Sequence, residues 1–382
     1  MKKKLLKYVK KQFKKSFKTK PLLVFSPGRI NLIGEHTDYN DGYTFPAAID
    51  KGITLAISKS DKNESEAIAL DKDESYTFKL NEVEPLKNGG WRNYIIGVVG
   101  ELQKTGVEFG NFQLVFSGNI PGGAGMSSSA ALENSVAFAL NELFELGLST
   151  SEMILISQKA EHNYAKVNCG IMDQYASMFG EKKSALLMDC RSITSEAFQI
   201  DFKPYKLILI NTNVKHDLSE SAYNDRRAVC ERVSAMLKVK ALRDASELDL
   251  MQLKKHLKEE DFQKALYIIQ ENKRVRAFMT AAENEDLKTL GKLLYQSHDG
   301  LSNQFQVSCT ELDFLVNYAK KSTAVIGSRM MGGGFGGCTI NLVHEDKLKE
   351  FKKEVRNAFK NEFNRDCSIY KVKLSKGTHL VE

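Results

Sequence analysis

The sequence lacks the paired motifs that mark many metalloproteins and disulfide-stabilised folds. Its six cysteines are scattered without a CxxC pair, and its seven histidines form no HExxH pattern. No window approaches the roughly 18 apolar residues of a membrane-spanning helix. The N-terminus also lacks the uninterrupted apolar core of a secretory signal. We therefore expect a cytoplasmic protein with reduced cysteines and no membrane partner.

Acidic residues are missing from the first 20 positions, which contain ten lysines. These lysines account for the net charge of +7, because the rest of the chain has 45 basic and 48 acidic residues. The charge belongs to an arm, and we expect no nucleic-acid partner. Apolar residues at helical spacing predict that the arm is a surface helix packed on the body: Leu5, Leu6, Val9, Phe13 and Phe17. A membrane-surface or nucleic-acid contact and a transit peptide are the alternatives.

The chain of 382 residues is long enough for two domains, and its composition is that of a globular protein. We predict an α+β fold with domains at residues 1–200 and 201–382. The expected strands are 22–25, ending at Pro27-Gly28, then 53–58, 76–80, 112–116, 205–211, 323–326 and 339–343. The expected helices are 130–146 and 150–167, followed by a mostly helical region from 221 to 320.

Residues 26–49, SPGRINLIGEHTDYNDGYTFPAAI, concentrate hydrogen-bonding side chains in a short stretch. Carboxylates accept hydrogen bonds from sugar hydroxyls, whereas histidine and arginine donate to them. The stretch therefore predicts a pocket for a small polyhydroxylated molecule. An ordinary polar loop after a strand is the alternative. The polar side chains are Arg29, Asn31, Glu35, His36, Thr37, Asp38 and Asn40.

Residues 119–131, NIPGGAGMSSSAA, lead into the helix predicted at 130–146. Gly122, Gly123 and Gly125 let the backbone approach a ligand closely, and a helix N-terminus offers free N–H groups to an anion. The loop has no lysine and is not a Walker A motif, and serine replaces the last glycine of a dinucleotide fingerprint. We predict a phosphate-binding loop, with a turn and helix cap without a ligand as the alternative.

A second glycine-rich loop, MGGGFGGC at residues 331–338, matches GxGxxG in letters only. The residues after it are expected to form a strand, whereas the dinucleotide fingerprint requires a helix. We predict that this loop lies against the substrate or the phosphate loop. A purely structural tight bend is the alternative.

Asp173, in the segment NCGIMDQ, follows the predicted helix that carries Glu161 and His162. Phosphoryl transfer requires cradled nucleotide phosphates, Mg²⁺ that bridges them, an aligned hydroxyl and a group that receives its proton. A serine hydroxyl and Glu161 are candidate Mg²⁺ ligands, Asp173 a candidate base and Arg29 a candidate for charge stabilisation. A carboxylate is a weak base for a sugar hydroxyl, so proton transfer should come late. For an isolated aspartate, a helix cap or a surface charge is the alternative.

Together these segments resemble the galactokinase family of the GHMP small-molecule kinases. GRINLIGEHTDYNDG is similar to the family's N-terminal signature, and PGGAGMSSSAAL is similar to the superfamily's ATP loop. CGIMDQ, SHDGL, VSCTELDFLV and GSRMMGGGFGGC match as well, in the same order. The resemblance implies a two-domain GHMP kinase architecture. Its N-terminal domain would be like ribosomal protein S5 domain 2, its C-terminal GHMP domain would be α+β, and the site would lie between them.

The resemblance also implies roles for individual residues. Asp173 would be the catalytic base and Arg29 the stabiliser of the transition state. The residues that contact the sugar would be Glu35, His36, Thr37, Asp38, Gly170 and Tyr223. The residues that bind ATP would be Gly123, Ala124, Gly125, Met126, Ser127, Ser128 and Ser129, with Trp91 near the adenine or, almost equally, in the core. The Mg²⁺ ligands would be Ser129 and Glu161.

The implied reaction transfers the γ-phosphate of ATP to O1 of α-D-galactose, giving α-D-galactose 1-phosphate and ADP in galactose catabolism. The expected partners are galactose and ATP with Mg²⁺, and we expect a monomer. One alternative is a sibling kinase for N-acetylgalactosamine or arabinose, against which the intact GEHTDYN argues. Another is a galactose sensor without turnover, against which the complete SSSAA and Asp173 argue.

Overall fold

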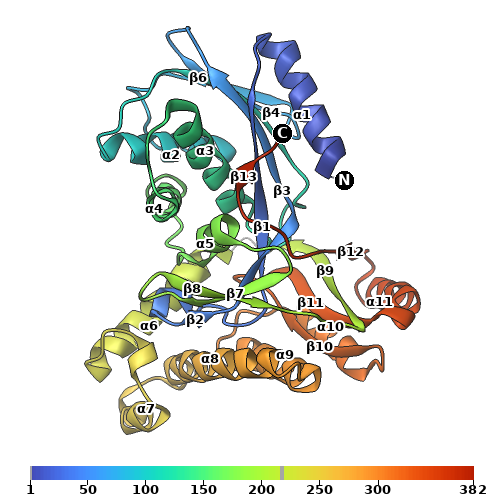
Figure 1. Cartoon of the computed structure of the whole chain (residues 1–382). Coiled ribbons are helices and arrows are strands. Elements are labelled where there is room, and N and C mark those ends of the chain that lie inside the picture. The colour runs from blue at the N-terminus through green and yellow to red at the C-terminus, as the bar shows by residue number, and fades with distance from the viewer. Residues whose placement is uncertain (1, 216–218) are drawn as a thin grey trace.

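The computed structural model describes residues 2–215 and 219–382, which are organised around three β-sheets (Figure 1). The six-stranded sheet contains, in spatial order, β13 (His379–Leu380), β1 (Leu22–Asn31), β3 (Pro46–Lys59), β6 (Phe112–Gly118), β4 (Ser65–Ala69) and β5 (Glu74–Phe78). The four-stranded sheet contains β10 (Val325–Met330), β11 (Gly336–His344), β9 (Tyr205–Lys215) and β12 (Ser368–Lys371). The three-stranded sheet contains β2 (Tyr43–Thr44), β7 (Ser184–Asp189) and β8 (Thr194–Gln199).

Helices cover these sheets. Those before residue 200 are α1 (Lys2–Phe17), α2 (Trp91–Lys104), α3 (Ser128–Phe144), α4 (Thr150–Ala160) and α5 (Met172–Phe179). The later helices are α6 (Ser219–Leu237), α7 (Glu247–Gln252), α8 (Glu259–Glu283), α9 (Leu287–Asn303), α10 (Thr310–Lys321) and α11 (Leu348–Phe363). Short 3₁₀ turns lie at Asp38–Asn40, Leu242–Asp244, Lys254–His256 and Glu345–Lys347, and a π-helical turn at Glu161–Ala165. Within the described ranges, none of the helices has the length and apolar character needed to cross a bilayer.

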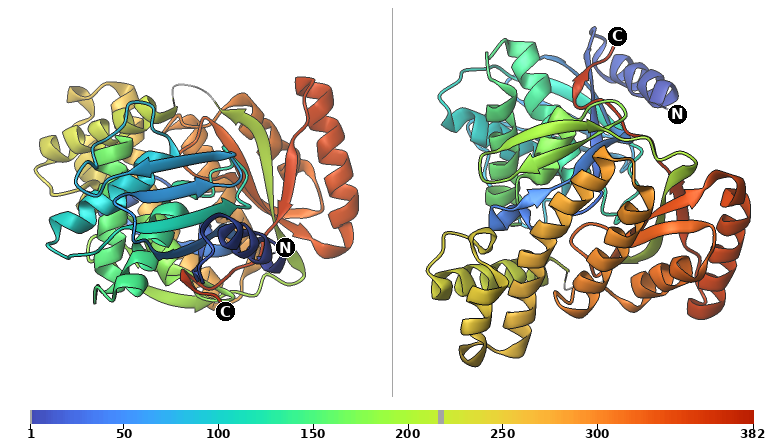
Figure 2. Two further views of the ribbon diagram at one scale, coloured as in Figure 1. Left: turned by 90° about the horizontal axis from the view of Figure 1, so that it is seen from above. Right: turned by 60° about the horizontal axis from the view of Figure 1, so that its bottom comes forward.

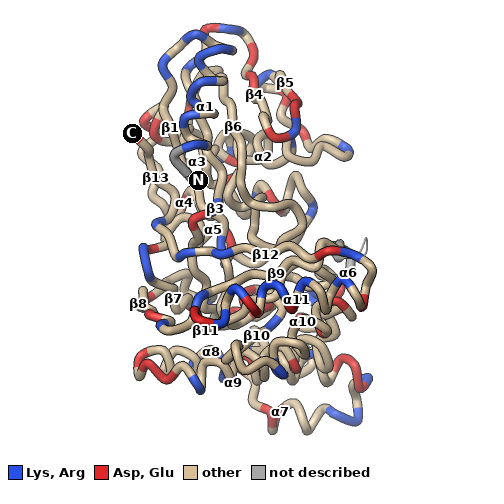
Figure 3. The backbone as a smooth tube through the Cα atoms, turned by 90° about the vertical axis from the view of Figure 1, so that its right-hand side faces the viewer, with Lys and Arg blue, Asp and Glu red and all other residues tan. Residues whose placement is uncertain are grey.

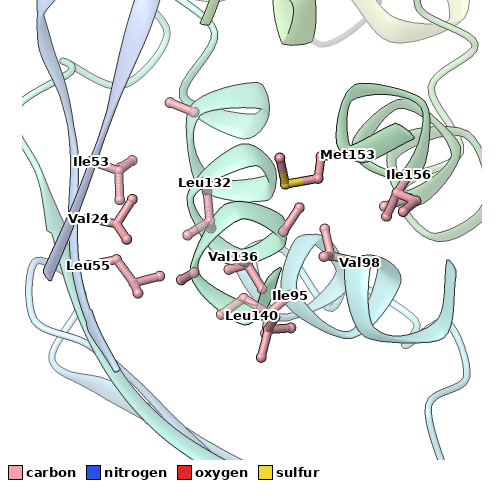
Figure 4. Packing of buried hydrophobic residues seen from close by; sticks show 14 of the residues in the cluster. Val24, Ile53, Leu55, Ile95, Val98, Leu132, Val136, Leu140, Met153 and Ile156 are labelled. Carbon is pink, nitrogen blue, oxygen red and sulfur yellow. The ribbon is translucent and has the colours of Figure 1, made fainter. Parts of the chain in front are cut away.

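The six-stranded sheet is covered on both faces, because alternate side chains of a strand point to opposite sides. Val24 and Leu55 face α2, α3 and α4, where they pack with side chains such as Val136 (Figure 4). Their neighbours Leu23 and Ala56 face the other way, toward α1. The strands therefore form the middle layer of three.

The lysine-rich arm forms the predicted surface helix. Val9 and Phe13 of α1 are fully buried and pack on Leu23 and Val115 of the sheet. The described lysines of this helix remain exposed, and Figure 3 shows them as a run of basic residues along α1. The apolar face of the helix is thus used inside the protein.

The four-stranded sheet also separates two cores. Leu209 and Ile340 face a core shared with α8, α9 and the segment that follows β1. Ile208 and Val343 face a second core with α10 and α11. The chain end returns to the first sheet, where Leu380 of β13 pairs with Val24, and two views place this end beside β1 and near α1 (Figures 1 and 2). The proposed domain division near residue 200 stays a prediction.

Most expected elements are present, including the helical region after residue 221, but several boundaries were wrong. The strand expected at 53–58 begins at Pro46, and the strand expected at 323–326 extends to Met330. The first strand does not end at Pro27-Gly28, because a shift in the β1–β3 register between Pro27 and Arg29 absorbs the proline and β1 continues to Asn31. The second helix ends at Ala160 and continues only as the π-helical turn. The sequence analysis did not identify α2, α5, α11, β2, β4, β7, β8, β12 or β13.

Candidate active site

The irregularity in β1 ties the predicted sugar segment to the phosphate loop. A Cβ at Gly28 would lie 2.5 Å from the carbonyl oxygen of Met126, so the two segments approach too closely for any other residue. The backbone N–H of Arg29 donates to the same carbonyl over 3.1 Å. The bulge therefore places Arg29 directly beside the loop that precedes α3.

Arg29 and Asp173 form a two-pronged ion pair. Nε and Nη2 of Arg29 lie 2.6 and 2.7 Å from Oδ1 and Oδ2 of Asp173, and Nη1 donates to the carbonyl of Gly125 over 2.5 Å. The hydroxyl of Ser127 also donates to Asp173 Oδ2. Asp173 lies in the first turn of α5, where the helix dipole favours a negative charge. Burial disfavours the charge on Arg29, but nearby carboxylates, with Asp173 foremost, raise its pKa.

This ion pair borders a cavity of about 180 Å³. Residues of the predicted sugar segment, of the region around α5 and of α6 line it, together with the backbone of Gly332 and Gly333. The structure thus brings together, around Arg29 and Asp173, the predicted sugar residues Glu35, His36, Asp38, Gly170 and Tyr223, as well as Glu161.

Burial shifts the pKa values of polar groups that line this cavity. Burial and the negative charge of Asp173 raise the pKa of Asp38 to about 7. Burial lowers the pKa of His36 to about 3, so its imidazole is neutral at pH 7, and its Nδ1 lies 2.8 Å from the hydroxyl of Tyr39. Gly170 packs directly on Asp38, because a Cβ there would lie 1.9 Å from Oδ2. Such desolvated groups are well suited to hydrogen bonds with a ligand.

The predicted phosphate loop adopts the backbone conformation that its glycines allow. Gly123, Gly125 and Ser127 have φ of 66°, 68° and 52°, and α3 begins at the next residue. With the loop at 331–338, this segment lines a second cavity of about 230 Å³. Tyr223 and Gly333 line both cavities, so the two are neighbours. A phosphate in the second cavity would therefore lie beside a ligand in the first.

Not every residue of the phosphate loop presents a side chain to this cavity. Ala124 and Met126 are 1% exposed and pack in the core shared with β9 and β11. Ser128 is exposed at the start of α3, and the hydroxyl of Ser129 hydrogen-bonds to Glu161. Ala124 and Met126 can therefore contact a nucleotide only through their backbone.

The environment of Glu161 fits a divalent cation. Burial and the charge of Asp173 raise the pKa of Glu161 to about 7, and burial together with the charge of Glu161 raises the pKa of Glu133 well above its usual value. Gln174 Nε2 donates to Glu161 Oε2 over 2.8 Å. Among the described residues, no group of three or more His, Cys, Asp or Glu is arranged to hold a metal alone. Mg²⁺ usually takes only one or two carboxylates and completes its shell with phosphates and water.

Two predicted site residues, Thr37 and Trp91, are not among the residues that line the two cavities. The hydroxyl of Thr37 donates to the carbonyls of Gly34 and Tyr43, so this side chain braces the sugar segment and does not line the cavity. The indole N–H of Trp91 donates to Glu74 over 2.7 Å, and its ring packs edge-on against a phenylalanine of β6. Trp91 lines neither of the two cavities described above.

The sequence analysis missed several residues that shape the site. Ser127 was assigned to ATP only, yet it also bonds the candidate base. Cys169 lines the cavity beside the Arg29–Asp173 pair, and Arg329 contacts Glu35 from β10. An arginine in a strand that is otherwise short on charge, VIGSRM, was the available signal for Arg329.

Comparisons with known proteins identify the family of the chain. Residues 11–59 match the galactokinase galactose-binding signature, residues 93–181 the GHMP kinase N-terminal domain, and residues 278–361 the GHMP kinase C-terminal domain. A galactokinase of Thermotoga petrophila is 38% identical over 94% of this chain and 99% of its own. A galactokinase of Clostridium acetobutylicum is 38% identical over 92% of this chain and 93% of its own.

Solved structures give the same result. The galactokinase of Lactococcus lactis, crystallised with galactose, has a TM-score of 0.93 and 34% identity, covering 97% of this chain and 98% of its own. A mevalonate kinase of Methanococcus jannaschii has a TM-score of 0.67 and 19% identity over 93% of this chain and 99% of its own, a likeness of fold alone.

Proposed function

The chain belongs to the galactokinase family of ATP-dependent GHMP kinases, and on this premise we propose that it transfers the γ-phosphate of ATP to O1 of α-D-galactose. The observation that carries the proposal is the Arg29–Asp173 ion pair, because it borders the sugar cavity and touches the phosphate loop through Gly125 and Ser127. A hydroxyl beside Asp173 would face a phosphate held by that loop.

In the proposed reaction, a bond forms between O1 of the sugar and the γ-phosphorus, and the bond to the ADP oxygen breaks. Asp173 orients the O1 hydroxyl and receives its proton. Arg29, which remains charged, stabilises the negative charge that develops on the transferred group. The N–H groups at the start of α3 and in the loop before it hold the phosphates.

The roles that we propose for the other predicted site residues depend on where these residues line the two cavities. The carboxyl groups of Glu35 and Asp38 accept hydrogen bonds from sugar hydroxyls. The neutral His36 ring also lines the cavity, and Gly170 leaves room for the Asp38 carboxyl group. Tyr223 lies between the sugar and phosphate cavities. The placement of Trp91 near the adenine stays a prediction, as do a monomeric state and a cytoplasmic location.

We propose that Ser129 and Glu161 hold Mg²⁺ together with the ATP phosphates. The bound ion would neutralise phosphate charge and so help the leaving group depart. The carboxylates near Glu161 support this assignment, because their shared burial raises their pKa and a cation would relieve the repulsion between them.

The test is a coupled assay of ADP release with Mg-ATP against galactose, N-acetylgalactosamine, arabinose, glucose, mevalonate and homoserine. We expect turnover on galactose well above that on the other compounds. Preferred turnover on another sugar would contradict the substrate and leave a sibling kinase. If no compound is phosphorylated while calorimetry detects galactose binding, the protein is a sensor and the proposed reaction is wrong.

A further inference from the structure

We infer that Arg329 is a positioning residue for the sugar, which holds the Glu35 carboxylate so that one of its oxygens faces the cavity. This inference deepens the proposed function and rests on it. Arg329 lies in β10, and its side chain has no exposed surface. A guanidinium is costly to bury unless its N–H groups are matched by acceptors, so its contacts deserve a physical explanation.

Most hydrogen-bond acceptors of the Arg329 guanidinium belong to the predicted sugar segment. Nε donates to the carbonyl of Leu32 over 2.7 Å, and Nη2 donates to the carbonyl of Asn31. Nη2 also lies 3.1 Å from Oε1 of Glu35, while Nη1 donates to the carbonyl of Met330 over 2.6 Å. Arg329 therefore fixes both the backbone at the end of β1 and the carboxylate that follows it.

Glu35 is held at one oxygen only. Its Oε1 accepts from Arg329 and, over 2.8 Å, from the backbone N–H of Gly332. In the described part of the chain, both hydrogen bonds of this carboxylate use Oε1, which leaves Oε2 to accept from a ligand in the cavity that Glu35 lines. The carbonyl of Glu35 is held separately by the hydroxyl of Tyr267 over 3.1 Å.

The same contacts connect the predicted sugar segment to the loop at residues 331–338. Gly332 belongs to the loop at 331–338, which starts one residue after β10 ends and lines both cavities. The Glu35 carboxylate thus connects the sugar segment to this loop through Arg329 and the Gly332 N–H. Lysine cannot reproduce this arrangement, because its donors radiate from a single nitrogen whereas the planar fork of arginine reaches several acceptors at once.

The first variants to measure are Arg329→Lys, Glu35→Gln and the double variant. Loss of a charged hydrogen bond corresponds to a change of roughly tenfold or more, so we expect each single variant to raise the KM for galactose about tenfold. The KM for ATP should stay within about two-fold of the wild type, since the phosphate loop keeps its contacts. The double variant should be hardly worse than Glu35→Gln, because Arg329 acts on the sugar through Glu35.

Arg243→Lys is the matched control. Arg243 also forms a two-pronged pair, with Asp189 at 2.5 and 2.8 Å, and donates to the carbonyl of Asp41 over 2.8 Å. It therefore supports the same segment without lining the cavity or contacting Glu35. This variant should leave the KM for galactose unchanged, which separates the positioning of Glu35 from general support of the segment.

The proposal is wrong if Arg329→Lys leaves the KM for galactose unchanged or raises the KM for galactose and the KM for ATP equally. It is also wrong if the increase in the KM for galactose in the double variant is the product of the increases in the two single variants. If Arg329→Lys does not fold, Glu35→Asp tests the same contact, because the shorter carboxylate cannot reach both the Arg329 fork and the cavity. An unchanged KM in Glu35→Asp would then overturn the proposal. Should the wild type prefer another sugar, the proposed function fails first, and the same comparison is made with that sugar.

Discussion

Gly170→Ala offers a sharp test of the sugar site, because the three atoms nearest to the added Cβ all belong to Asp38. A Cβ at this position would lie 1.9, 2.2 and 2.8 Å from Oδ2, Cγ and Cβ of Asp38. Real Cβ atoms essentially never approach other atoms closer than 3.0 Å, so the carboxyl group must move by roughly 1 Å. Gly170 does not have a positive φ, so alanine brings no backbone strain.

The expected effect follows from the hydrogen bond that Asp38 would lose. A hydrogen bond to a charged group contributes about 1.5 to 3 kcal/mol, which corresponds to an increase in the KM for galactose of roughly 10- to 150-fold. The KM for ATP should change by less than about two-fold, because the phosphate loop is not touched. The melting temperature should fall, since overpacking a buried site costs about 1 to 3 kcal/mol.

Initial rates from ADP release, together with calorimetric titration of galactose without ATP, measure this effect. Gly110→Ala is the matched control, because its Cβ would meet only an atom of Phe144 at 3.8 Å and its φ is also not positive. A wild-type KM for galactose in Gly170→Ala would refute the contact between Asp38 and the sugar. Equal increases for galactose and ATP would instead indicate general damage to the site.

Three further predictions address the base, the charge balance and the arm. Asp173→Asn should lower kcat about 10²- to 10⁴-fold while calorimetry still detects galactose, and normal turnover would remove Asp173 from the role of base. Asp38→Asn should raise the melting temperature at about pH 8, and this gain should shrink toward about pH 5. The reason is that the pKa of Asp38 is raised to about 7 in the folded protein. The Asp38 carboxyl group therefore destabilises the fold increasingly as pH rises from its unfolded pKa to about 7. A gain in melting temperature that does not depend on pH would contradict this explanation. Phe13→Ala should lower the free energy of unfolding in denaturant titrations by about 3 kcal/mol, because Phe13 is fully buried. The KM for galactose should stay unchanged. An unaltered free energy of unfolding would refute the docking of α1.

The sequence predicted the elements whose signals are local. Glycine and serine residues at 119–131 predicted a loop that leads into a helix, and α3 does begin within this stretch at Ser128. The lysine arm was recognised as a docked helix because Val9 and Phe13 fall on one helical face. Each of these predictions depends on a pattern confined to fewer than about 20 consecutive residues, which periodicity can reveal.

Features set by contacts between distant segments could not be read in the same way. The continuation of β1 past Pro27 depends on how β3 pairs with it, because the bulge is a property of two strands. Thr37 belongs to a motif rich in sugar-binding residue types, yet its hydroxyl is taken up by two backbone carbonyls. The residue type was readable from the sequence, but the direction of the side chain was not.

The location of the site explains why its supporting residues were the hardest to predict. Ile30 and Leu32 at the end of β1 pack in the same core as Leu209 and Ile340 of the second sheet, so the sugar segment is embedded in a core that late parts of the chain complete. A backbone segment buried in this way needs acceptors and donors from its surroundings. Arg329 supplies them to the carbonyls of Asn31 and Leu32, and Glu271 of α8 accepts from the N–H of Gly34 over 3.0 Å. The backbone at residues 31–34 is therefore held by Arg329 and Glu271, which lie more than 200 positions away, and substitutions of these two residues should affect sugar recognition without touching the motif itself.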